Sequence, residues 1–141
     1  MDDRQTAKRL LTENEYSLCV VRAENVLYSS HTSGILPLYQ AFAGGMHFES
    51  CSAADKVVGL GAAMLWQALG IKVLHAHIIS QHALEFFSGY DIDISYDILA
   101  SRIKSRTGDG VCPIEALALS SDSFDSFLSG VHTFLSEKEL I

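Results

Sequence analysis

The sequence predicts a single three-layer α/β domain over residues 1–141, with a central mixed sheet and helices on both of its faces. Three observations support this fold class. Strand-like and helix-like segments alternate along most of the chain, which is typical of strands joined by helical crossovers. The length of 141 residues fits one domain of common size. The hydrophobic fraction of 48% is high enough to fill a core on both sides of a sheet.

The first third of the chain predicts a helix, a hairpin and a second helix. Residues 2–13 carry apolar side chains at helical spacing among charged ones. Residues 17–22 and 25–30 are strand-like runs separated by two residues, which is a hairpin signal. Pro37 suits the first turn of a helix that ends near the following pair of glycines.

The most apolar stretch of the chain predicts one long helix. Residues 54–69 are apolar on almost all sides up to Gly70, so we expect this helix to be buried on most faces. In this interpretation Gly59 and Gly61 lie inside the helix. They would then allow close packing against a neighbour and would not form a phosphate-binding loop.

The second half of the chain predicts two strands and three helices. Residues 72–79 are typical of a central strand, and residues 81–88 of a helix. Residues 91–97 alternate isoleucine with polar side chains, which predicts a half-exposed strand. Residues 102–110 are predicted to be a basic loop containing glycine. Two helices are expected to close the chain, at residues 112–119 and 123–135.

Charge and cysteine content limit the possible partners and the compartment. The net charge of −7 argues against a nucleic-acid partner held by its phosphates, although a small anion in a local basic pocket remains possible. Three widely spaced cysteines are not a disulfide framework, so we expect a reducing, cytoplasmic location.

Hydrophobicity predicts association with other copies of the chain, not with a membrane. The N-terminal segment is charged and is not a signal peptide, and the most apolar stretch is too short to span a bilayer. The high apolar content instead predicts an exposed face that another copy of the chain covers, and therefore a homo-oligomer.

Two motifs carry a resemblance to a known family. They are CSAADKVVGLGAA, over residues 51–63, and RTGDGVCPIE, over residues 106–115. Together they resemble an uncharacterised prokaryotic family, a domain of unknown function whose members carry an ADKVVG helix and an RTGxGxCPxE turn. The resemblance extends from the first hairpin to Glu115. It implies a cytidine-deaminase-like fold without the zinc site, and it implies no established activity.

The residues agree with the absence of zinc that this resemblance implies. Zinc deaminases carry a His or Cys with a Glu two residues later, and then Pro-Cys-x-x-Cys at the start of the next helix. Here the predicted long helix begins with alanine at position 53, and Ser80-Gln81-His82 contains no cysteine. A His47-Phe48-Glu49 sequence lies before the long helix and lacks cysteine partners. We therefore predict no metal and no cofactor.

Cys112 is the sharpest catalytic candidate. It follows a Gly-Asp-Gly turn and precedes Pro113, so it is expected at the N-cap of a helix, where the dipole and free amides stabilise a thiolate. The upstream basic residues, Arg106 among them, would favour the thiolate further. The alternative is a plain helix start, with Pro113 in the first turn and Glu115 in a capping box.

Asp55 and Lys56 form a second candidate pair at the start of the predicted long helix. Asp55 is a candidate acid/base, and Lys56 a candidate contact for an anion. The alternative is that Asp55 only places a favourable charge at the helix N-terminus and that Lys56 extends to solvent. We expect Asp55 to share a cleft with Cys112. The remaining candidate ligand-binding residues come from the second motif and are Arg106, Gly108, Gly110 and Glu115.

His75 and His77 point to the same face of the predicted central strand, but no third metal ligand is evident. Core or rim histidines held by hydrogen bonds are the more common case. Two functions therefore remain open. One is a binding module for a nucleotide, a base or another small anionic metabolite. The other is an enzyme with Cys112 as nucleophile or sulfur carrier and Asp55 as acid/base.

Overall fold

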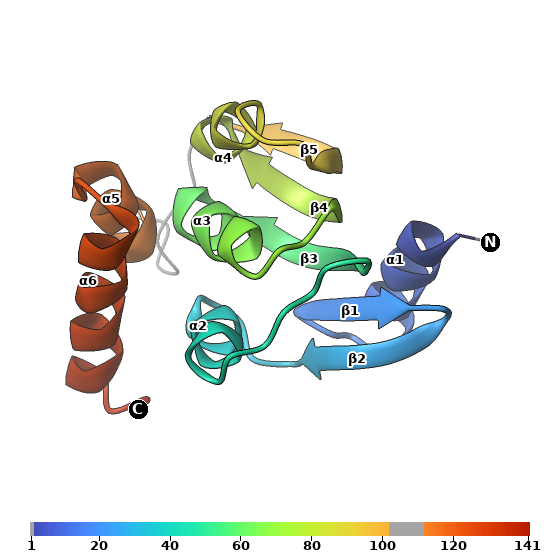
Figure 1. Ribbon diagram of the computed structural model, residues 1–141, viewed down its shortest axis with the longest axis horizontal. Helices are drawn as coiled ribbons and strands as arrows, with labels where there is room; N and C mark the ends of the chain where they lie inside the picture. Colours follow the sequence, from blue (N-terminus) through green and yellow to red (C-terminus); the bar gives the residue numbers. More distant parts are fainter. Residues whose placement is uncertain (1, 102–111) are drawn as a thin grey trace.

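The structure is a computed structural model that describes residues 2–101 and 112–141 (Figure 1). Helices and strands alternate along the chain after an N-terminal helix and hairpin. In chain order the elements are α1 (Asp3–Glu13), β1 (Leu18–Arg22), β2 (Asn25–Ser30), α2 (Leu36–Ala43), β3 (Ser52–Val58), α3 (Leu60–Ala68), β4 (Val73–Ser80), α4 (Gln81–Phe87), β5 (Asp93–Ala100), α5 (Pro113–Ser120) and α6 (Phe124–Glu137).

The strands form one mixed sheet in the order β2-β1-β3-β4-β5. β1 is antiparallel to both β2 and β3, whereas β3, β4 and β5 run parallel to one another. The antiparallel pair β1–β2 is a hairpin, and the parallel pairs are joined through helices α3 and α4, as parallel strands require. The predicted α/β class is confirmed.

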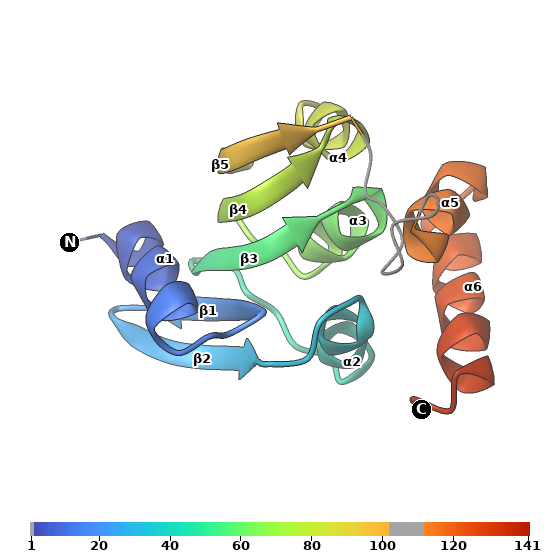
Figure 2. The ribbon, with the colours of Figure 1, turned by 180° about the vertical axis from the view of Figure 1, so that it is seen from behind.

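Helices cover the two faces of the sheet unequally. α1 lies on one face, over β1 and β3, whereas α2, α3 and α4 lie on the other (Figures 1 and 2). α5 and α6 pack beyond the edge at which β3 and β4 end (Figure 2). On the α1 side of the sheet, α1 reaches β4 only in part, and Arg4 of α1 forms a 2.6 Å ion pair with Asp93 at the start of β5.

Two hydrophobic clusters match these layers. The larger one lies between the sheet and α2, α3 and α6, and it contains Trp66, Phe48 and Phe127, each buried. The smaller one lies under α1 and includes Leu11 and Cys19. Burial raises the pKa of the Cys19 thiol to about 11, so this cysteine is an inert core residue.

The hairpin, both N-terminal helices, the later strands and the two C-terminal helices lie where the sequence predicted them. The prediction of one long helix over residues 54–69 is wrong. The first part of that stretch is strand β3, and the helix α3 begins only after Gly59. The first four residues of β3 are all buried, and periodicity does not distinguish such a run from part of a buried helix.

The correction changes the position of several candidate residues. Ala53 and Asp55 lie within β3, so neither stands at a helix start. Gly59 is the N-cap of α3 and lies between strand and helix, contrary to the prediction. Gly61 does serve close packing: a Cβ atom there would lie 2.6 Å from Cγ2 of Ile114 and 2.9 Å from Cζ of Phe127.

Candidate functional site

An open pocket of about 380 Å³ lies between α1 and the sheet. Its lining comes from α1 and the residues just after it, and from β3, β4 and β5. Lys8 and Glu15 line it from the helix side, and Lys56 lines it from β3. The floor is polar, since His75 and His77 of β4 and Asp97 of β5 all line it.

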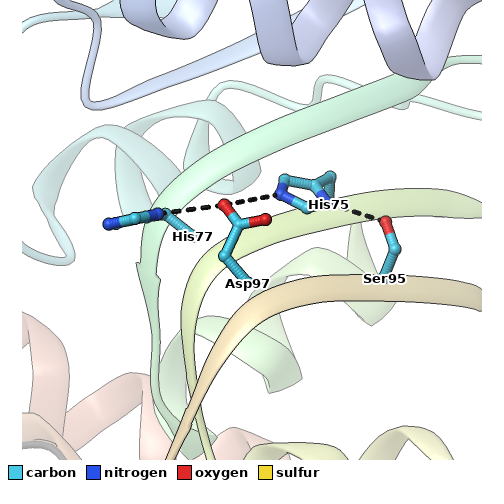
Figure 3. Close-up of polar contacts among 4 residues, drawn as sticks. All are labelled: His75, His77, Ser95 and Asp97. Atoms are coloured by element: carbon cyan, nitrogen blue, oxygen red, sulfur yellow. Dashed lines mark hydrogen bonds and ion pairs between the residues drawn. The ribbon is translucent and has the colours of Figure 1, made fainter.

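A chain of hydrogen bonds connects the floor residues (Figure 3). Oδ2 of Asp97 lies 3.2 Å from Nε2 of His75 and 3.0 Å from Nδ1 of His77, so one carboxylate joins both rings. The other ring nitrogen of His75 lies 2.8 Å from Oγ of Ser95. In Figure 3 the two imidazole rings lie on opposite sides of the Asp97 carboxylate, and the ring of His77 extends away from it.

Burial and hydrogen bonding set the charges in this chain. The side chain of His75 is only 4% exposed, and burial lowers the pKa of its imidazole despite the opposing effect of Asp97. Hydrogen bonds from His77 and His75 lower the pKa of the Asp97 carboxyl. At neutral pH, Asp97 is therefore an ionised acceptor, and His75 is neutral.

These charges determine where the protons lie. An ionised Asp97 only accepts hydrogen bonds, so Nε2 of His75 and Nδ1 of His77 must both donate to it. Neutral His75 then accepts from the Ser95 hydroxyl at Nδ1. Whenever His77 is neutral, its lone pair is on Nε2, which has no hydrogen-bond partner among the described residues. The side chain of His77 is 52% exposed.

Two lysines bring positive charge to this pocket. Lys8 and Lys56 are both exposed, and within residues 2–101 and 112–141 neither forms an ion pair. The positive charge of Lys8 acts on both His75 and Asp97, since it contributes to lowering the pKa of each. The lining also contains the carboxylates of Glu15 and Asp97, so the two lysines balance its acidic side chains in a chain whose net charge is −7.

The sequence singled out the two histidines and Lys56 but missed the residues that join them. The sequence does contain a signal for this cluster, because His75 and His77 are two residues apart, as are Ser95 and Asp97. In the parallel pair β4–β5, His75 lies opposite Ser95, so both spacings fall on one face in register. Pairing the two strands in the sequence would have brought the four residues together.

Asp55 lies on β3 and is buried, with an exposed fraction of 6%. Oδ2 of Asp55 accepts a 2.8 Å hydrogen bond from Nε1 of Trp66, and the backbone N–H groups of Lys56 and Val57 also donate to the carboxyl. Burial outweighs these donors and raises the pKa of Asp55 to about 7. No hydrogen bond or ion pair connects Asp55 with Cys112 among the described residues.

Glu115, a candidate ligand-binding residue, lies between the starts of α3 and α4. Its side chain is buried, and Oε2 accepts a 3.4 Å hydrogen bond from the backbone N–H of Leu60, the first residue of α3. Oε1 accepts a 3.1 Å hydrogen bond from Oγ of Ser80, the N-cap of α4. A carboxylate from α5 thus occupies the place between two helix starts where an external anion would bind.

Cys112 is the N-cap of α5, and Pro113 is the first residue of the helix, as predicted. The thiol is half-buried against the larger cluster and makes no capping hydrogen bond. Arg106, Gly108 and Gly110 lie outside the described residues. The second motif is therefore described only from Cys112 onward.

The described residues contain no group of three or more His, Cys, Asp or Glu side chains arranged to hold a metal ion. They also contain no helix that is both long enough and apolar enough to cross a bilayer.

The fold and the pocket define a small α/β protein with a five-stranded mixed sheet. The chain belongs to the family described as a domain of unknown function, DUF1893, whose model matches residues 6–135. It is similar to the crystal structure of a DUF1893 family protein from Thermotoga maritima, with a TM-score of 0.80 and 27% identity over 92% of this chain and 87% of that chain. No curated protein matched. The membership of an uncharacterised family, predicted from the two motifs, is confirmed.

Proposed function

We propose that this protein is a binding module for a small anionic metabolite, held in the pocket between α1 and the sheet. A nucleotide or another phosphorylated compound fits this chemistry. The observation that carries the proposal is the pair of unpaired lysines, Lys8 and Lys56, at a pocket floored by two histidines. Lysine ammonium groups are common phosphate contacts in proteins.

The proposal keeps Lys56 as a ligand contact and replaces the other expected contacts. The carboxylate of Glu115 is engaged by Leu60 and Ser80, so it has a structural role. Arg106, Gly108 and Gly110 stay predictions. The new contacts are Lys8 and His77, which line the same pocket as Lys56.

Titration calorimetry with inorganic phosphate and with nucleoside monophosphates tests this function. We expect saturable binding that Lys8→Met and Lys56→Met each weaken about tenfold, since a hydrogen bond to a charged group contributes about 1.5–3 kcal/mol. Lys72→Met is the matched control, because Lys72 is an exposed lysine just before β4 and does not line the pocket. Absence of binding, or equal losses in all three variants, contradicts the proposal.

Catalysis by Cys112 as a nucleophile or sulfur carrier is the second candidate. Its position at the N-cap of α5, with no capping hydrogen bond from the thiol, supports it. Asp55 is a poor partner, because its carboxyl is buried and hydrogen-bonded to Trp66. Alkylation rates of Cys112, measured with Cys19 and Cys51 changed to serine, test this candidate. A rate no faster than that of a free thiol in a peptide would rule it out.

We also propose that the fold is deaminase-like and without zinc. Its support is that α3 and α4 begin directly after parallel strands, at Gly59 and Ser80. Zinc deaminases carry their ligands at two helix starts, whereas the residues here are Gly59-Leu60-Gly61 and Ser80-Gln81-His82. Elemental analysis that finds about one zinc per chain, retained against a chelator, contradicts the prediction.

A further inference from the structure

The uncommon feature of the pocket is the environment of His77. Its Nδ1 is 3.0 Å from an ionised carboxylate, and its Nε2 has no hydrogen-bond partner among the described residues. Free imidazole has two equivalent choices for its proton, but here Asp97 holds the proton on Nδ1. The lone pair therefore stays on Nε2, which belongs to an exposed side chain beside two lysines. A histidine in this state is a nucleophile that needs no further activation.

Ser95, His75 and Asp97 contain the residue types of a hydrolase triad, but their placement does not support that role. Oγ of Ser95 is hydrogen-bonded to His75, and Ser95 does not line the pocket, whereas His77 does. The Ser95 and His75 pair therefore acts on the opposite side of Asp97. It holds the carboxylate in place, and Asp97 in turn orients His77.

We propose that His77 is a catalytic residue that accepts a phosphoryl group at Nε2 from a small acyl phosphate or phosphoanhydride bound by Lys8 and Lys56. This inference rests on the proposed function, because the same lysines hold the substrate. Asp97 is a positioning residue. The lysines balance the charge on the phosphoryl oxygens, which is the main contribution a protein makes to this reaction class.

The step balances without an oxidant or a metal. The Nε2 lone pair attacks phosphorus, a P–N bond forms, and the bond from phosphorus to the leaving oxygen breaks, with its electron pair leaving on the carboxylate or phosphate. The ring becomes positively charged, and its Nδ1 proton stays hydrogen-bonded to Asp97, which neutralises it. Water or a second acceptor then attacks phosphorus, the P–N bond breaks, Nε2 recovers its electron pair, and the acceptor's proton passes to solvent.

The test uses acetyl phosphate, an acyl phosphate, and pyrophosphate, a phosphoanhydride, as small phosphoryl donors on the 141-residue chain. The label is located by mass spectrometry at alkaline pH, and its acid lability distinguishes a phosphohistidine from a phosphoserine at Ser95. We expect His77 to be labelled at least about tenfold faster than the exposed His31, His47 and His132, which are internal controls in the same chain. Labelling of His77 at the same rate as these histidines overturns the proposal.

Variants separate the roles of the neighbouring residues. His77→Asn is expected to lose the fast label, and Asp97→Asn to slow it by about tenfold or more, since an amide cannot neutralise the ring. Ser95→Ala is expected to slow the labelling less than Asp97→Asn does, because Ser95 reaches Asp97 only through His75. An unchanged rate in Asp97→Asn, with thermal unfolding showing that it folds, also overturns the proposal. If phosphate binds in the pocket but His77 is not labelled, only this inference fails; if phosphate does not bind, the proposed function fails.

Discussion

Nε1 of Trp66 donates a 2.8 Å hydrogen bond to Oδ2 of Asp55, and this bond ties α3 to the middle of β3. Asp55 lies opposite Leu18 of β1 and Ala76 of β4, so a carboxyl group is buried at the centre of the sheet. Such a group is stable only with hydrogen-bond partners, and the indole supplies one from the helix that covers it. The pair therefore has a structural role.

Asp55 makes the stability of the fold depend on pH. Burial raises its pKa from 3.8 to about 7, so between these pH values the folded state binds a proton that the unfolded state has lost. The contribution of Asp55 to the free energy of unfolding is complete below about pH 4 and is lost as the pH rises through 7. In urea unfolding at a series of pH values, this group alone lowers the free energy of unfolding by up to about 1.4 kcal/mol per pH unit over that range.

Asp55→Asn removes this titration, so we expect its free energy of unfolding to fall less steeply with pH than that of the wild type. The matched control is Asp91→Asn, which changes an exposed aspartate and should keep the wild-type slope. Parallel curves for wild type and Asp55→Asn between pH 4 and 7 would show that the carboxyl is already ionised when folded.

Removing the indole donor should destabilise the fold in a pH-dependent way. Trp66→Phe keeps most of the apolar volume but leaves Asp55 without its side-chain donor. The ionised carboxylate needs that donor more than the protonated form does, so we expect a larger loss of stability at pH 8 than at pH 5. In the Asp55→Asn background the cost of Trp66→Phe should no longer vary with pH. Equal losses at both pH values in the wild-type background would contradict this.

Glu115→Ala tests the closure of the sheet edge. The variant leaves the N–H of Leu60 and the hydroxyl of Ser80 without their acceptor, and we expect a loss of about 1–3 kcal/mol in chemical unfolding. Glu137→Ala, an exposed glutamate on α6, should stay within about 0.5 kcal/mol of the wild type. A neutral effect of Glu115→Ala would mean that water replaces the carboxylate there.

Gly61→Ala tests the packing of α3 against α5 and α6. The new methyl group would meet Ile114 at 2.6 Å and Phe127 at 2.9 Å, so we expect a loss of about 1–3 kcal/mol. Gly89→Ala is the control, since a Cβ atom there meets its nearest neighbour only at 3.6 Å. Comparable thermal unfolding midpoints of the two variants would show that α5 and α6 can move away from α3 without loss of stability.

Glu24→Gly should stabilise the hairpin. Ala23 and Glu24 form the turn with φ values of 51° and 68°, which favour glycine, and Asp3 accepts hydrogen bonds from both backbone N–H groups. We expect a gain of about 0.5–1 kcal/mol on thermal unfolding. The same change at an exposed helical site, Glu85→Gly in α4, should cost about 1 kcal/mol. A loss in both variants would indicate that the Glu24 side chain stabilises the turn.

Self-association remains a prediction, and the structure offers a location for it. β5 is an edge strand, and its Tyr96, Ile98 and Leu99 are all more than 40% exposed. Unprotected apolar edges tend to pair with another strand. We expect sedimentation to find a dimer or larger species at micromolar concentration, and Ile98→Lys to weaken it. A monomer under those conditions, or an assembly unaffected by Ile98→Lys, would exclude this edge as the interface.

The sequence by itself determined the elements that have a local signal, such as alternating polar and apolar residues, a turn or a proline at a helix start. Alternation in β5, the Ala23-Glu24 gap in the hairpin and Pro113 at the start of α5 each has a local cause, so each was predicted correctly. The two family motifs likewise identified an uncharacterised family without any tertiary information.

Only the tertiary structure decided which strands pair and which distant side chains come into contact. β3 was taken for a helix because burial on both faces removes periodicity, and only its pairing with β1 and β4 makes it a strand. Packing of helices on the sheet placed Asp55 against Trp66 and Glu115 against Ser80. The pairing of β4 with β5 aligned His75 and His77 with Ser95 and Asp97. Contacts between residues far apart in the chain depend on strand order and register, which local residue patterns do not encode.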